Sequence, residues 1–123
     1  MPRGRDASLE LAYAASDAYE HEGANLAVID RVLDDLFERA EVSELDAVAL
    51  RRDLRFVLTT NRTAPSCMRI MALADDVRTA NAHVHTASGR RERQVWRKHT
   101  RKMHAELTRQ VAVTLDALLS ESR

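Results

Sequence analysis

From Arg90 to Arg123 the chain contains neither Gly nor Pro, the two residues that most often interrupt a helix. A helix of about 30 residues is roughly 45 Å long, whereas a compact domain of this size has a radius of gyration near 14 Å, by an order-of-magnitude scaling. The segment therefore predicts a long C-terminal helix that projects beyond a bundle or lies along an elongated one. Gly89 stands immediately before it and marks its expected start.

The rest of the chain is also poor in turn-forming residues, with three Gly and two Pro in 123 residues. Ala, Leu, Arg and Glu, which are good helix formers, are abundant, and no segment shows the alternation of a strand. We predict an all-α fold, an elongated bundle of four to five helices with a long basic C-terminal helix. Residues 1–5 are expected to form a flexible basic arm, and residues 6–123 a single helical-bundle domain.

Capping residues and apolar periodicity predict the first two helices. The first is expected to run from about Asp6 or Ser8 to Glu22, with Gly23 as the residue that ends it. A second is expected over residues 25–40, where apolar residues recur at helical spacing. These are Leu26, Ile29, Leu33, Leu36, Phe37 and Ala40.

Two further helices are expected in the middle of the chain. A capping pattern headed by Ser43 predicts a third helix that ends near residue 60. Pro65 suits the first turn of a helix and predicts a fourth over residues 66–85, with a loop before it. The connection 86–89 is short, so the fourth and fifth helices should be antiparallel neighbours.

The first half of the C-terminal helix is strongly basic. Residues 90–104 contain seven Arg or Lys and one acid, Glu92, while Trp96 and Met103 form a narrow apolar seam, with Trp96 as its main anchor. Like charges this close weaken an isolated helix, but they are tolerated where the surface meets a polyanion or an acidic protein. The candidate binding residues are Arg90, Arg91, Arg93, Arg97, Lys98, Arg101 and Lys102.

Phosphate contact by Arg and Lys is the expected mode of binding, because Trp96 is the only aromatic ring in this stretch apart from histidines. Such contacts hold a DNA or RNA backbone without reading its sequence. An acidic protein surface is the alternative partner, in which case the chain is an interaction module such as a regulator or a phage-type inhibitor.

Metal and thiol chemistry are not indicated. No His has the Glu-x-x-His spacing of a carboxylate-bridged metal bundle, so neither a metal nor a cofactor is expected. Cys67 is the single cysteine, which excludes an internal disulfide. It heads the apolar face of the fourth helix, and we expect it in the core rather than as a reactive thiol.

The formal net charge is zero, but the charges are unevenly placed. Residues 1–60 contain 7 Arg and 13 acids, whereas residues 61–123 contain 12 Arg or Lys and 6 acids. Two poles of opposite charge would allow copies of the chain to associate head to tail. The sequence shows no apolar run of membrane-spanning length and no apolar region of a secretory signal, so we expect a cytoplasmic protein without membrane contact.

Size, helicity and the basic face together resemble the small helical subunits of multisubunit CRISPR effector complexes. The resemblance implies a role in antiviral defence as one part of a ribonucleoprotein assembly. Several copies would then line a guide–target duplex and contact its phosphates. It carries over no individual residue.

Two Arg–His pairs, Arg97 with His104 and Arg93 with His99, resemble the Arg-x(4–6)-His motif of the HEPN ribonucleases. Those enzymes are all-helical and of similar length, and the resemblance implies cleavage of RNA by such a pair at a dimer interface. The residues by themselves favour a non-enzymatic binding face, and we assign no catalytic residue.

Overall fold

The computed structural model describes the backbone of residues 3–121 and the side chains of residues 21–121. Within that range the chain forms four helices and no strand. α1 spans Arg3–Arg39, α2 Glu44–Thr60, α3 Pro65–Thr86 and α4 Arg90–Glu121. The predicted all-α bundle with a long C-terminal helix is therefore confirmed, and α4 has 32 residues.

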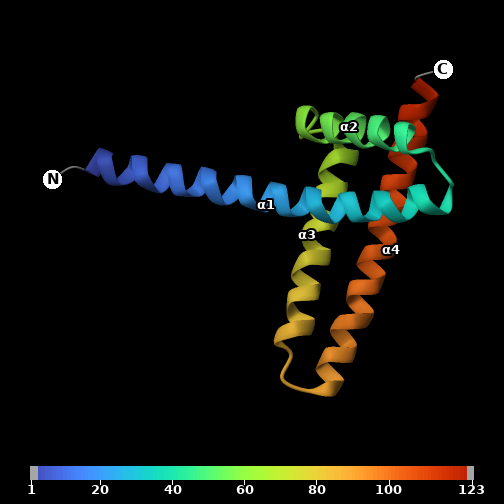
Figure 1. Cartoon of the computed structure of the whole chain (residues 1–123). Helices are drawn as coiled ribbons and strands as arrows, with labels where there is room; N and C mark the ends of the chain where they lie inside the picture. The colour runs from blue at the N-terminus through green and yellow to red at the C-terminus, as the bar shows by residue number, and fades with distance from the viewer. Residues whose placement is uncertain (1–2, 122–123) are drawn as a thin grey trace.

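α3 and α4 form an antiparallel hairpin, and α1 crosses it (Figure 1). α2 follows α1 and lies at the end of the hairpin that is away from its turn. The turn itself, between Thr86 and Arg90, projects past α1, so the first turns of α4 have only α3 beside them. The predicted pairing of the two C-terminal helices is confirmed, and it leaves the basic half of α4 uncovered.

α1 is one helix across the position where the sequence predicted two. Gly23 lies inside it, and no described glycine has a positive φ. The prediction that a helix ends at Gly23 is wrong for a simple energetic reason. A glycine inside a helix costs about 1 kcal/mol, whereas two new helix ends expose up to eight backbone groups that need other partners. The same helix contains residues 3–5 of the predicted basic arm; residues 1 and 2 lie outside the described range.

α1 instead ends at a Schellman motif. The N–H of Val42 donates to the carbonyl of Phe37 at 3.0 Å, and the N–H of Glu41 donates to that of Glu38 at 3.2 Å. Glu41 takes the left-handed conformation that this motif requires, with a φ of 53°. A position usually held by glycine is thus held by glutamate, which no sequence pattern indicated.

The starts of α2 and α3 agree with prediction. Ser43 caps α2, since its side chain accepts a hydrogen bond of 3.2 Å from the N–H of Asp46. Pro65 is the first residue of α3, where its missing N–H costs no helical hydrogen bond.

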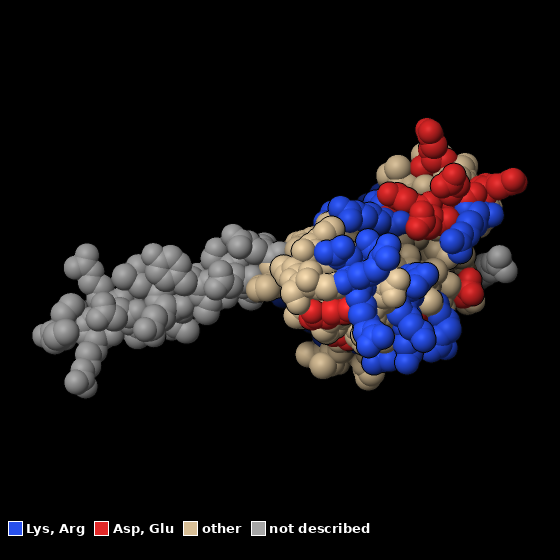
Figure 2. Space-filling view, turned by 90° about the horizontal axis from the view of Figure 1, so that it is seen from below, with Lys and Arg blue, Asp and Glu red and all other residues tan. Residues whose placement is uncertain are grey.

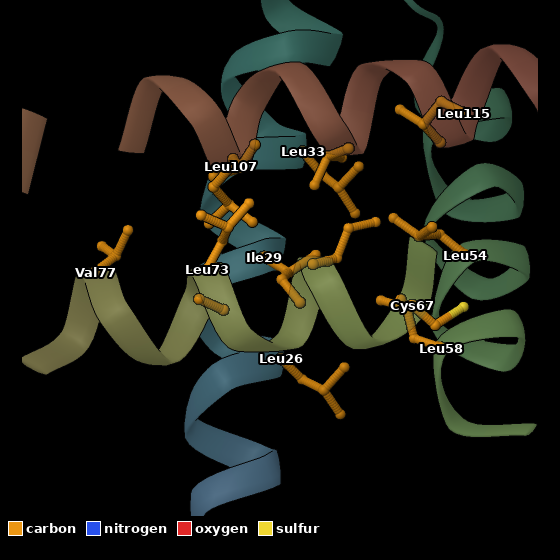
Figure 3. Packing of buried hydrophobic residues seen from close by; sticks show 14 of the residues in the cluster. Leu26, Ile29, Leu33, Leu54, Leu58, Cys67, Leu73, Val77, Leu107 and Leu115 are labelled. Atoms are coloured by element: carbon orange, nitrogen blue, oxygen red, sulfur yellow. The ribbon is translucent and has the colours of Figure 1, made fainter. Parts of the chain in front are cut away.

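The core lies where α1 crosses the hairpin, and α2 closes one side of it (Figure 3). All four helices contribute buried side chains, among them Ile29, Leu33, Leu54, Leu58, Ile70, Leu73, Leu107, Val111 and Leu115. Cys67 is 2% exposed and belongs to this cluster, which confirms its predicted core position. In α4 the fully buried residues begin at Leu107, so the core ends where the basic stretch begins.

Polar contacts between helices fix how α1 sits on the others. Arg51 of α2 pairs with Asp30 and Asp34 of α1, and these carboxylates raise the pKa of the guanidinium. Asn25 of α1 is buried, and its Oδ1 accepts a hydrogen bond of 2.8 Å from Nη1 of Arg78 in α3. The buried amide oxygen therefore has a partner, as a stable core requires.

Candidate nucleic-acid interface

The first turns of α4 have one neighbour, the C-terminal half of α3, and α1 comes beside α4 from about Thr100 onward. Ala80 and Val84 are the buried residues of α3 at that end of the hairpin. Since neither α1 nor α2 covers this end (Figure 1), the charged side chains of α4 point into solvent. All seven predicted binding residues are exposed: Arg90, Arg91, Arg93, Arg97, Lys98, Arg101 and Lys102.

None of these seven side chains forms an ion pair with an acid among residues 21–121. Elsewhere in the same range, six of nine Arg do form one. They are Arg51, Arg52, Arg62, Arg69, Arg78 and Arg109. Ion pairing is thus common among the other Arg residues of this range, whereas the Arg and Lys residues in the basic half of α4 form none.

The two acids nearest to the basic residues in the sequence are engaged elsewhere. Glu92 accepts hydrogen bonds from Ser88, at 3.1 Å from the hydroxyl and 3.4 Å from the backbone N–H, and so caps the start of α4. Glu106 lies one turn after Lys102, but a hydrogen bond from Arg109 holds it and lowers the pKa of its carboxyl. The seven positive charges therefore remain uncompensated.

A groove of about 810 Å³ lies between the two helices of the hairpin. Arg97, Lys98 and Arg101 line it from α4, and Asn81 and His85 line it from α3. Positive charge on one wall and hydrogen-bonding groups on the other suit a phosphate or another anion.

The basic surface also continues onto α1. A hollow of about 480 Å³ is lined by Arg101 together with Arg39 and Asp35, and one of about 420 Å³ by Arg31 together with Arg78. Both Arg31 and Arg39 are exposed and unpaired among the described residues. Figure 2, which looks at the turn end of the hairpin, shows Lys and Arg gathered on this face, with most Asp and Glu toward one edge and a few beside the basic residues.

The sequence alone missed Arg31 and Arg39, because they lie in the acidic half of the chain and about sixty to seventy residues before their neighbours on α4. The only signal was weak: they are isolated Arg residues on the polar side of a helix rich in Asp and Glu. Only the crossing of α1 over the hairpin brings Arg39 beside Arg101 and Arg31 beside Thr100 and His104.

Trp96 lies toward the other flank of the hairpin, with His83 and His99. Its ring stacks on His83, with centroids 4.2 Å apart and planes inclined by 15°, and His99 meets it edge-on at 5.9 Å. Trp96 is half-buried and is not part of the core cluster. Trp96 is thus not fully buried, the condition on which its predicted large contribution to stability depended, and it contacts α3 by stacking on His83.

The residues of the two Arg–His pairs all lie on α4. Arg97 and His104 are two turns apart, about 10 Å along the axis; Arg97 lines the hairpin groove, and His104 lines the hollows next to α1. His99 contacts Trp96, and Arg93 lies on a different side of the helix. RNA cleavage by either pair stays the untested alternative to a non-enzymatic binding face.

Within the described range, no three His, Cys, Asp or Glu side chains come together as metal ligands. None of the helices, over the same residues, has the length and apolar character needed to cross a membrane.

The chain was compared with protein-family models, curated proteins and solved structures. No match was found. No residue therefore takes its role from a relative.

Proposed function

We propose that this protein binds DNA or RNA by contacting the phosphate backbone with the basic half of α4, and that it does so without catalysis. One observation carries the proposal: seven exposed Arg and Lys lie together with no acidic partner among the described residues. Each of these side chains is free to neutralise a phosphate, and the release of counterions from the nucleic acid then favours binding. The groove beside Arg97 and Arg101 supplies a concave surface for the backbone.

The test is a titration of labelled duplex and single strands at several salt concentrations. Engaging about five phosphates should give a slope of log K against log salt near −4 to −5 on duplex. Arg97→Ala should weaken binding and make the slope shallower by about one, and Arg97→Glu should weaken it further by adding repulsion. Arg109→Ala is the matched control, because it removes the same charge from the same helix where Glu106 already neutralises it.

Absence of binding even at low salt would remove nucleic acid as the direct partner. The same surface would then face an acidic protein, the alternative that fits an unpaired basic helix. A pull-down on a poly-Glu matrix distinguishes that case: the matrix should retain the wild-type protein and should not retain the Arg97→Glu variant.

The absence of catalysis is tested on the same preparations. Single-stranded RNA should stay intact after incubation with purified protein. Cleavage abolished equally by Arg97→Ala and His104→Ala would overturn the non-enzymatic proposal and favour the HEPN-like alternative.

We also propose that the protein works as one part of a larger assembly, as its resemblance to small CRISPR effector subunits implies. Leu45, Val48 and Phe56 of α2 are 81%, 66% and 66% exposed, and exposed large apolar side chains are available for contacts with another protein. Glu44 and Asp46 adjoin them and would complement the basic half of α4 in a second copy. Sedimentation at low and high salt tests this: salt-sensitive oligomers are expected, and a monomer throughout would contradict head-to-tail association.

A further inference from the structure

His83 of α3 forms a ring cluster with Trp96 and His99 of the proposed binding half of α4, and this cluster plays no part in phosphate contact. Trp96 stacks on His83 across the two helices of the hairpin, and His99 approaches its edge. His83 and His99 are exposed and Trp96 is only half-buried, so the cluster keeps ring surface in contact with solvent.

A cation and an exposed apolar residue lie next to the cluster. Lys102 lies one turn after His99 on the same helix and is not ion-paired among the described residues. Val95, 62% exposed, lies one turn before His99. Flat rings open to solvent and flanked by a free ammonium group are the combination that binds single-stranded nucleic acid, with a base on the rings and a phosphate on the cation.

A duplex cannot use the rings in this way, because its bases are already stacked and paired. From this difference we infer that the ligand is single-stranded DNA or RNA, with an unpaired base stacking on the His83–Trp96 pair. The inference rests on the proposed function and narrows it: phosphate contact by Arg and Lys accepts either form, whereas ring contact requires an unpaired base. The stack also ties α3 to α4 near the turn, so binding and stability must be measured separately.

The experiment compares a single-stranded oligonucleotide with a duplex of equal length at one salt concentration. Trp96 is the only tryptophan of the chain, so its fluorescence reports on the cluster directly. We expect tighter binding of the single strand, accompanied by quenching of Trp96. His83→Ala should weaken single-strand binding about 5- to 100-fold, the effect of losing one stacked base, and leave duplex binding unchanged. His21→Ala is the matched control, because His21 is an exposed His on α1 that lies beside the first turns of α3 and not beside its last.

His83→Phe separates stacking from folding. It keeps a flat ring at this position, so the folded variant should bind single strands nearly as well as the wild type. Equal losses in His83→Ala and His83→Phe, both folded by circular dichroism, would overturn ring stacking.

The failures of the two proposals look different. Absence of binding to both forms at low salt overturns the proposed function and this inference together. Equal affinity for both forms, with unchanged Trp96 fluorescence, overturns the inference alone and leaves phosphate contact in place.

Discussion

The hydroxyl of Ser88 donates a hydrogen bond of 3.1 Å to Oε2 of Glu92, and the backbone N–H of Ser88 approaches the same oxygen at 3.4 Å. Glu92 is the only acid among residues 90–104, and these contacts hold it at the N-terminus of α4. There its negative charge interacts favourably with the positive end of the helix dipole. A single carboxylate thus caps the helix without pairing with any of the seven cations of this stretch.

Glu92→Gln should separate the effect of the hydrogen bonds from Ser88 from the effect of the negative charge. The amide keeps a hydrogen-bond acceptor but loses the charge, so the free energy of unfolding should fall by about 0.3–1 kcal/mol. Affinity for nucleic acid should rise about twofold, because one nearby negative charge is gone. Urea denaturation and a binding titration check the pair of changes. A fall in affinity would indicate that Glu92 itself contacts the ligand.

Arg39 should contribute to binding although it lies on α1. It lines the hollow shared with Arg101, so Arg39→Ala should weaken nucleic-acid binding about two- to fivefold and flatten the salt dependence by up to one unit. Arg55→Ala is the control, since Arg55 is also exposed and unpaired among the described residues but lines a hollow with Glu22 on another part of the surface. Equal losses in both variants would mean that overall charge, and not the continuous surface, determines affinity.

Gly23→Ala should stabilise the protein by about 0.5–1 kcal/mol, because Gly23 lies inside α1 and an added Cβ meets nothing within 4 Å. Ala24→Gly, at the next position of the same helix, should destabilise it by a similar amount. Thermal melts of the two variants measure the difference. A lower melting temperature for Gly23→Ala would show that the helix is interrupted here after all.

Glu41→Gly should also stabilise the protein, because at this position glycine is the favourable residue. Glu41 has a φ of 53°, and a left-handed conformation costs a residue with a Cβ roughly 1 kcal/mol relative to glycine. Part of that gain is offset by the greater freedom of glycine in the unfolded chain, so about 0.5–1 kcal/mol is expected. Ala40→Gly, one residue earlier and without a positive φ, should destabilise instead. Urea midpoints of the two variants give the signs.

The local sequence was enough to predict the helices that begin at recognisable signals. Ser43 and Pro65 mark the starts of α2 and α3, and the uninterrupted run after Gly89 marks α4. Such signals act on backbone groups within one turn, so they need no tertiary contact. The exposure of the basic residues was also predictable from the sequence. Seven charges within 13 consecutive positions of one helix, from Arg90 to Lys102, cannot all be buried.

The tertiary structure alone decided what local signals could not. Gly23 looks like a helix end and Glu41 does not, yet α1 runs through the first and stops at the second. The presence of glycine at one position and its absence at the other each cost only about 1 kcal/mol. The packing of α1 across the hairpin can override a local preference of that size. The same crossing places Arg39 beside Arg101, and the pairing of α3 with α4 stacks His83 on Trp96. These neighbours are distant in the chain, and only the packing of the helices makes them one surface.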